Sequence, residues 1–382
     1  MSYRITHVIT GLAVGGAEKT LCALASRANA SGLAVSVVSL GPEGSISRTL
    51  RAEGVDLHHL GLRNAATSPF RLRRLRQLLS RTRPDLIQGW MYHGNLAAYL
   101  GGRHLHVPIL WNVRHSLHRD DLFKMTTRWA VRANAFLSDR TSGIVYNSEV
   151  SKTQHEQYGF SKRRSVLIPN GIDIEAFDRD VAARDVTRRH LGIDDSETVL
   201  IAVGRVHPIK GHEVLMDAFS RVLSARGNTR LVVVGRGADW AAEPFSDYAH
   251  QDELRSQVSL VEESDRIPDL LAAADIFVNA SHSEGFPNAV AEAMTAGLPC
   301  VVTDVGDSST LIDGCGTVVC PGDPEALSAA VIDLLRTNAD ERNRLGERAR
   351  RRIESHFSLD RISGLYDDLY RRVLSGTFGD AG

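Results

Sequence analysis

The sequence predicts an α/β protein of two doubly wound, Rossmann-like domains that face each other across a central cleft. Short apolar runs typical of buried strands alternate with helical patterns along the whole chain. This alternation restarts at residues 198–204, after a turn-rich junction at residues 170–173. The length of 382 residues also exceeds what one compact core usually holds, which favours two domains.

The first half follows this pattern from its first residues. A glycine-rich loop at residues 11–16 separates the first strand from a helix at about residues 17–30, and an arginine-rich helix covers residues 71–81. The strands are expected at residues 5–10, 34–40, 84–88, 108–113, 143–147 and 165–169.

The second half repeats the alternation after a charged segment at residues 178–195, which we expect to form a helix and a linker. Its helix at residues 289–296 has Asn288 as the expected N-cap and a stop signal at residues 297–299. A closing helix is expected at residues 359–374. The strands are expected at residues 198–204, 230–235, 258–261, 276–279 and 300–303.

Charge is distributed unevenly, although the net charge is only −1. Residues 1–172 contain 23 Lys and Arg against 10 Asp and Glu, and the remainder contains 22 against 36. This asymmetry indicates that the first half faces an anionic surface or substrate. The helix at residues 71–81 is either a solvated surface helix or a helix lying on an anionic membrane. No nucleic-acid recognition motif accompanies the charge, so nucleic acid is not an expected partner.

The chain has no apolar run of 18 residues and begins with a strand pattern, so neither a transmembrane helix nor a signal peptide is expected. The four cysteines lack metal-ligand spacing, and reduced cysteines are typical of a cytoplasmic protein.

The most informative segment carries two glutamates on either side of a helix start. Glu284 lies in the loop before the helix and Glu292 lies inside it. A helix N-terminus attracts phosphate, whereas carboxylates accept hydrogen bonds from sugar hydroxyls. The segment therefore suits a nucleotide-sugar, in which a diphosphate joins two hydroxyl-bearing groups. The alternative is that both glutamates are solvated charges.

Two loops that follow strands could hold a diphosphate. Gly15 and Gly16 lie in the loop before the first helix and let the backbone approach a ligand closely, although the same glycines also suit a plain tight turn. Arg205 and Lys210 flank a proline-stiffened turn in the second half, and both are suited to phosphate unless they are simply solvated.

Three polar residues of the first half are candidates for the reaction centre. His115 directly follows a predicted strand, at the end that borders the cleft. His93 is the alternative histidine for the reaction centre, and a lone histidine can also have a purely structural role. Ser148 could hydrogen-bond in the same cleft or cap the following helix.

The order and spacing of four motifs resemble the retaining glycosyltransferases of family four, which have the GT-B fold. These motifs are Gly-Gly-Ala-Glu at residues 15–18, Asn-Gly-Ile-Asp at 170–173, Gly-Arg with Lys-Gly at 204–211, and Glu-Gly-Phe-Pro-Asn through Glu-Ala-Met at 284–294. The resemblance implies an acceptor-binding domain at residues 1–172 and a donor-binding domain at residues 173–357. A closing segment at residues 358–382 would pack back on the first domain.

The resemblance also implies residue roles. Arg205 and Lys210 would hold the diphosphate of a UDP- or GDP-sugar and stabilise the leaving nucleotide. Glu284 would bind the donor sugar and Glu292 the ribose. The backbone N–H groups of Phe286, Asn288 and Ala289 would donate to sugar and phosphate oxygens.

The resemblance implies that transfer retains the anomeric configuration and uses no metal or other cofactor. Gly16 would lie near the donor phosphates or the acceptor, and His115 would lie at the reaction centre. The expected acceptor is a glycan on a polyprenyl diphosphate, built at the inner face of the cytoplasmic membrane for a surface polysaccharide. Two alternatives are a transferase with a soluble acceptor and a non-catalytic sugar-binding relative.

Overall fold

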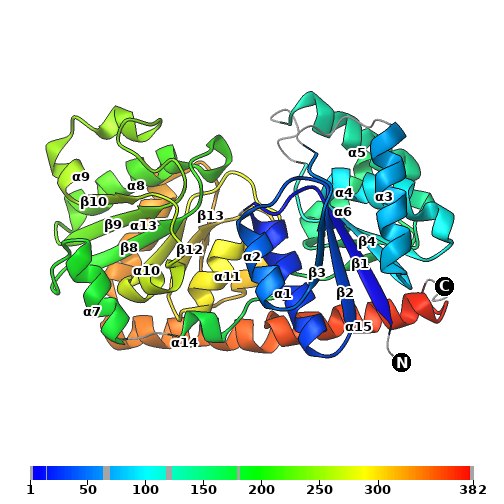
Figure 1. Ribbon diagram of the computed structural model, residues 1–382. Coiled ribbons are helices and arrows are strands. Elements are labelled where there is room, and N and C mark those ends of the chain that lie inside the picture. Colours follow the sequence, from blue (N-terminus) through cyan, green and yellow to red (C-terminus); the bar gives the residue numbers. More distant parts are fainter. Residues whose placement is uncertain (1–2, 14, 63–68, 118–122, 179–180, 379–382) are drawn as a thin grey trace. The chain divides into compact units, whose positions relative to one another are not determined.

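The computed structural model describes residues 3–13, 15–62, 69–117, 123–178 and 181–378 (Figure 1). The chain divides into two compact units. The first unit comprises Met1–Gly171 and Leu359–Gly382, and the second comprises Ile172–Ser358. Each unit is α/β and is built around its own parallel sheet, as the sequence predicts.

The sheet of the first unit has seven described strands in the order β3-β2-β1-β4-β5-β6-β7. Ile5 in the inner strand β1 pairs in register with Val35 on one side and Leu86 on the other. The strands are β1 (Arg4–Ile9), β2 (Ala34–Ser39), β3 (Asp56–His59), β4 (Leu86–Trp90), β5 (Ile109–Val113), β6 (Gly143–Tyr146) and β7 (Ser165–Leu167). Edge strand β3 was not predicted, because three of its four residues are polar or titratable.

Helices cover both faces of this sheet, so that alternate residues of β1 enter different cores. Ile5 and Ile9 lie in one core with Tyr366, whereas Val8 lies in the other with Leu79. The helices are α1 (Gly16–Ala30), α2 (Ser45–Ala52), α3 (Pro69–Thr82), α4 (Met91–Gly102), α5 (Met125–Leu137), α6 (Glu149–Tyr158) and α15 (Leu359–Leu374). The last of these is the predicted closing helix.

The sheet of the second unit has six described strands in the order β10-β9-β8-β11-β12-β13. The strands are β8 (Thr198–Val203), β9 (Thr229–Val234), β10 (Val258–Val261), β11 (Ile276–Asn279), β12 (Cys300–Thr303) and β13 (Gly316–Val319). Their side chains divide between two cores, one on each face of the sheet. Because β8 and β11 are neighbours, the loops that follow them begin side by side.

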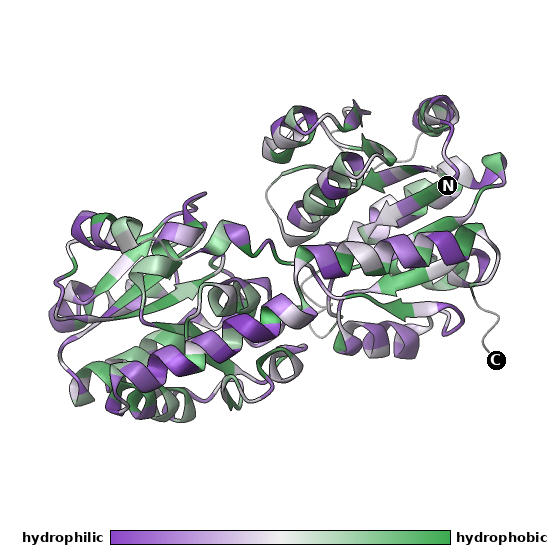
Figure 2. Ribbon diagram, turned by 90° about the horizontal axis from the view of Figure 1, so that it is seen from below, coloured by the Kyte–Doolittle hydropathy of each residue, from purple (hydrophilic) through white to green (hydrophobic). Residues whose placement is uncertain are grey.

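The helices of the second unit surround its sheet, and Figure 2 shows hydrophilic residues alternating with hydrophobic ones along them. They are α7 (Val181–His190), α8 (His212–Ala225), α9 (Asp252–Ser256), α10 (Ile267–Ala273), α11 (Asn288–Thr295), α12 (Ser308–Ile312), α13 (Pro324–Arg336) and α14 (Ala339–His356). Residues 179–180 of the predicted charged segment lie outside the described ranges. No helix of the described ranges combines the length and apolar character needed to cross a membrane.

Candidate functional site

The structure joins two predicted site residues in an ion pair. Lys210 ends a short 3-10 helix (Pro208–Lys210) after β8, and Glu284 lies in the loop between β11 and α11. The Lys210 ammonium donates to Glu284 Oε1 at 2.5 Å. Only 19% of the Lys210 side chain and 12% of the Glu284 side chain are exposed. Because both side chains are mostly withdrawn from water, loss of either partner would destabilise the protein more than loss of one partner of a surface pair would.

The Glu284 carboxylate is held by a second donor. The hydroxyl of Ser281 donates to the same Oε1 at 2.8 Å, and Ser281 is fully buried. The carbonyl of Ser281 in turn accepts from the hydroxyl of Thr303, at the end of β12, at 2.7 Å. Two neighbouring strands therefore fix the position of Glu284, which is the preorganisation that a binding residue requires.

The loops after β8 and β11 approach too closely for any side chain at Gly211. Its φ is +62°, and a Cβ there would lie 2.1 Å from the carbonyl oxygen of Ala280. The N–H of His282 also donates to the carbonyl of Ile209 at 2.8 Å. The Lys-Gly pair of the sequence motif thus has a structural reason: only a glycine after the lysine lets the loops after β8 and β11 approach this closely.

A third loop meets the Glu284 loop from the side of β12. Gly306 has φ +57°, and a Cβ there would lie 2.3 Å from the carbonyl oxygen of Gly285. That carbonyl accepts from the N–H of Asp307 at 3.0 Å. The sequence prediction did not identify Ser281 or Gly306 as parts of this site, because their roles come from contacts between loops far apart in the chain.

Helix α11 begins differently from the prediction. Pro287, and not Asn288, occupies the N-cap position, and its carbonyl accepts from the N–H groups of Val290 at 3.1 Å and Ala291 at 3.2 Å. The prediction of Asn288 as N-cap was wrong, because the N-cap backbone conformation suits a proline and its carbonyl can accept the first helical hydrogen bonds. Asn288 and Ala289 are the first two helical residues, so their N–H groups point out of the helix end that carries positive potential.

The remaining predicted donor residues differ in exposure. Arg205 is exposed just beyond β8, on the same loop as Lys210. Glu292 is half-buried in α11. The Phe286 side chain is 6% exposed and packs against Phe357 with ring centroids 5.7 Å apart, so only its backbone remains for the predicted ligand contact.

In the first unit, Gly16 is the exposed first residue of α1. The nearby Glu18 folds back over the loop, so that a Cβ on Gly15 would lie 2.3 Å from its Oε2. Burial raises the pKa of Glu18 above its ordinary value. A carboxylate in this position would repel a phosphate and would accept a hydrogen bond from a hydroxyl.

His115 lies just beyond β5 in a loop that α6 holds in place. Its Nδ1 lies 2.7 Å from the carbonyl of Ser116, and since a carbonyl only accepts, Nδ1 carries the proton. The backbone carbonyl of His115 accepts from the Ser151 hydroxyl at 2.8 Å. The ring contacts Phe123 edge-on, with centroids 5.1 Å apart. The orientation of this imidazole is thus set by α6 and Phe123.

The two other candidates of the first unit are in more confined places. His93 is the third residue of α4; burial lowers its pKa, and its Nε2 is buried without a hydrogen-bond partner among the described residues. Ser148 is fully buried, and its hydroxyl accepts from the N–H of Ser151 at 3.0 Å as the N-cap of α6. Of the two roles the sequence left open for Ser148, the structure shows the helix cap.

One basic residue beside His115, Arg114, was not predicted as a site residue. Arg114 donates to Asn170 and, at 2.5 Å, to the hydroxyl of Tyr366 on α15. Its guanidinium also lies 5.0 Å from the ring centroid of Trp90. Arg114 therefore joins the closing helix to the ends of β4 and β5, and the Asn170 motif gains a structural explanation.

Comparison with protein families supports the assignment that these motifs suggest. Residues 14–176 match the model described as "Glycosyltransferase Family 4", and residues 197–337 match that described as "Glycosyl transferases group 1". The chain belongs to the family-four glycosyltransferases. The two matches cover most of the first unit and most of the second.

Curated relatives of this glycosyltransferase family differ in what they act on. A D-inositol 3-phosphate glycosyltransferase of Segniliparus rotundus is 31% identical over 247 residues, which are 63% of this chain and 53% of that protein. A UDP-Gal:alpha-D-GlcNAc-diphosphoundecaprenol alpha-1,3-galactosyltransferase of Escherichia coli is 26% identical over 72% of each chain. The alignments span about half the length of the first curated relatives, at 53% and 47%.

Solved structures share the fold. Anabaena Alr3699/HepE, in complex with UDP and glucose, aligns with a TM-score of 0.83 over 97% of this chain and 99% of that chain, at 20% identity. The sucrose-phosphate synthase of Thermosynechococcus elongatus aligns with a TM-score of 0.80 at 17% identity, over 98% of this chain and all of that one. The predicted GT-B fold is confirmed.

Proposed function

We propose that this protein transfers a sugar from a UDP- or GDP-sugar to a hydroxyl of a lipid-linked glycan, with retention of configuration. The observation that carries the donor half of the proposal is the Lys210–Glu284 pair beside the start of α11. A cation, a carboxylate and a helix N-terminus are thereby gathered within one unit. These are the groups that a sugar diphosphate needs.

The donor would replace the contact that Lys210 and Glu284 make with each other. Lys210 would turn toward the diphosphate together with Arg205, and both would stabilise the charge that develops on the leaving nucleotide. Glu284, still held by Ser281, would accept hydrogen bonds from the sugar hydroxyls. Glu292 would bind the ribose.

The backbone would complete this donor site. N–H groups of Phe286, Asn288 and Ala289 would meet sugar and phosphate oxygens at the start of α11. Because the charge on the diphosphate would be met by side chains and a helix end, the proposed reaction uses no metal. The departing phosphate would take the proton of the acceptor hydroxyl, so no strong protein base is required.

The acceptor half of the proposal concerns the first unit. His115 and His93 follow strands β5 and β4 of its sheet, and Glu18 offers a carboxylate to a hydroxyl beside Gly16. A similar enzyme of Escherichia coli is named for a diphosphoundecaprenol-linked acceptor. The excess of basic residues in the first half fits an acceptor that carries a negatively charged diphosphate.

A peripheral position on an anionic membrane is part of the proposal, and α5 supports it. Met125, Trp129 and Phe136 follow each other at helical spacing and are 65%, 62% and 77% exposed. Arg132 lies over the ring of Trp129 and Arg140 over that of Phe136. Exposed aromatic rings flanked by arginines are typical of helices that lie in a membrane interface.

Nucleotide release from a panel of UDP- and GDP-sugars, with and without bacterial lipid extract, tests the proposal. We expect release from one donor that rises with lipid and is lost in Glu284→Ala. Release that rises with water-soluble glycans instead would replace the lipid-linked acceptor by a soluble one. Sugar-nucleotide binding without release under any condition would refute the enzymatic proposal and favour a sugar-binding relative.

A further inference from the structure

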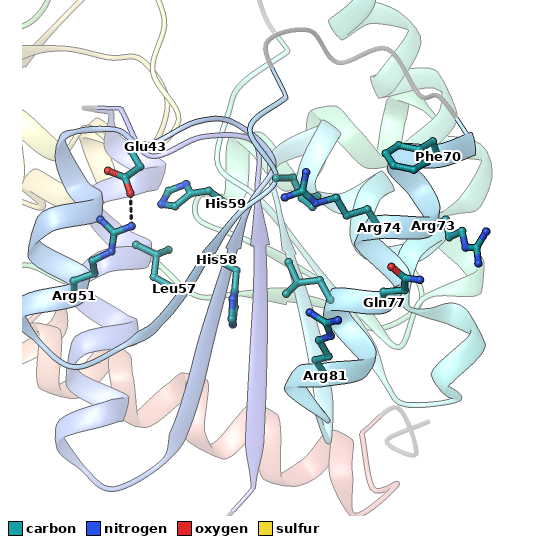
Figure 3. A pocket seen from close by; sticks show the side chains of 12 residues that line it. Glu43, Arg51, Leu57, His58, His59, Phe70, Arg73, Arg74, Gln77 and Arg81 are labelled. Atoms are coloured by element: carbon teal, nitrogen blue, oxygen red, sulfur yellow. Dashed lines mark hydrogen bonds and ion pairs between the residues drawn. The ribbon is translucent and has the colours of Figure 1, made fainter.

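The first unit has a pocket of about 670 Å³ at the edge of its sheet, between β3, α2 and α3 (Figure 3). None of the residues that line it belongs to the site predicted from the sequence. Edge strand β3 contributes His58 and His59, and α3 contributes the opposite wall. The pocket therefore needs an explanation of its own.

The wall formed by α3 is cationic. Arg74, Gln77, Leu78 and Arg81 have the spacing of one helix face, and all four line the pocket. Figure 3 shows Arg74 and Arg81 on the side of α3 nearer to the strand, whereas Arg73 extends from the opposite side. Neither Arg74 nor Arg81 makes an ion pair or hydrogen bond with a residue that the structure describes, and both are exposed.

The carboxylates near the pocket do not balance this charge. Glu43, the acidic residue among those that line it, is paired with Arg51, which lowers the pKa of Glu43. Asp56 contacts His58, with Nε2 and Oδ2 3.0 Å apart. Arg74 and Arg81, together with Arg73 on the outer side of α3, thus line the pocket without a counter-ion from the described part of the chain.

The rim adds an apolar surface to the charged wall. Phe70, at the start of α3, lines the pocket with 76% of its surface exposed. Leu78 also lines the pocket, one helical turn before Arg81. An exposed phenylalanine beside unpaired arginines suits a ligand that is both anionic and organic.

We propose that this pocket binds the diphosphate group of an organic ligand, with Arg74 and Arg81 as its principal contacts. Two guanidinium forks match the two phosphoryl groups of a diphosphate, each as a bidentate pair. The volume leaves room for the group attached to the diphosphate, which would extend past Phe70. Identification of that ligand as the lipid-linked acceptor rests on the proposed function, whereas diphosphate binding does not.

Calorimetric titration of the full chain with inorganic pyrophosphate, farnesyl diphosphate and farnesol tests this inference. The titrations use the Lys210→Met background, which weakens the other predicted diphosphate site. The test variant is Arg74→Gln with Arg81→Gln. The matched control is Arg103→Gln with Arg163→Gln, since both arginines are exposed in the first unit and lie outside the pocket.

We expect both diphosphates to bind at least about tenfold more weakly to the test variant, since two charge-assisted contacts are lost. The control should keep the original affinity. Tighter binding of farnesyl diphosphate than of pyrophosphate would support a lipid-linked source, and equal binding would support the diphosphate alone. Equal affinity of the test variant and the control would overturn the proposal, as would farnesol binding as well as farnesyl diphosphate.

These outcomes are independent of the donor-site proposal. Loss of diphosphate binding in the test variant supports the pocket even where no donor sugar is turned over. Conversely, Glu284→Ala tests donor turnover and leaves the pocket unchanged, because the two sites are in different units.

Discussion

Substitutions in the Lys210–Glu284 pair should change the free energy of unfolding as well as the activity. The perturbations are Lys210→Met and Glu284→Gln, singly and combined, because each removes one charge and keeps most of the side-chain volume. Each single variant leaves the other charge mostly buried without its partner. The double variant removes both charges and with them the cost of withdrawing them from water.

The magnitude follows from the distance of 2.5 Å and the low exposure of both side chains. Coulomb attraction at that distance is about 2 kcal/mol in bulk water and about 7 kcal/mol at an effective dielectric constant of 20. Desolvation of both ions offsets much of the larger value. We therefore expect a coupling free energy of about 1–3 kcal/mol, with the double variant less destabilised than the sum of the singles.

Urea unfolding of the four proteins measures this coupling, and the exposed pair Arg336–Asp333 provides the control. Those two side chains are 66% and 74% exposed, and their coupling should stay below about 0.5 kcal/mol. Both single variants should also lower kcat/KM for donor turnover by about a hundredfold. Additive effects on stability would refute the assigned pair, and unchanged turnover in both singles would refute its role with the donor.

Three further predictions follow from other contacts. Gly211→Ala should destabilise the second unit by at least about 2 kcal/mol in urea unfolding, because its Cβ would meet the Ala280 carbonyl, whereas Gly192→Ala, where a Cβ meets nothing within 4 Å, should cost less. Burial lowers the pKa of His155 to about 4, so the unfolded chain binds its proton first, and stability should fall as pH drops from about 6.5 toward 4; His155→Gln should flatten that fall. Trp129→Ser with Phe136→Ser should weaken binding to anionic vesicles at least about tenfold in a sedimentation assay, and unchanged binding would exclude α5 as the membrane contact.

Much of the fold could be predicted because most strands are continuous apolar runs. Residues 258–261, 276–279 and 300–303 were predicted as strands with the bounds that the structure gives. Strand β3 was missed because its sequence is Asp-Leu-His-His, and an edge strand tolerates polar residues that a central strand would not. Strand β13 was also missed. It is an edge strand of the sheet in the second unit, and its four residues are only partly buried.

The candidate site was predictable in its charged residues and not in what holds them. Lys210 and Glu284 stand out in the sequence because both lie in loops after apolar strands. Their contact does not, since it joins residues 74 positions apart through the packing of β8 against β11. Ser281 likewise carries no sequence signal, because its hydroxyl has a role only once Thr303 fixes its carbonyl.

The arginine-rich helix shows why a charge pattern alone leaves its meaning open. The sequence offered a solvated face or a membrane face for residues 71–81. The structure divides that charge, because Arg76 bonds the carbonyl of Leu100 at 3.4 Å, whereas Arg74 and Arg81 line a pocket beside β3. A strand that was itself unpredictable supplies the second wall, so no reading of α3 by itself could have found the pocket. Titration with a soluble diphosphate and with anionic vesicles separates these roles, because Arg74 and Arg81 should govern the first and α5 the second.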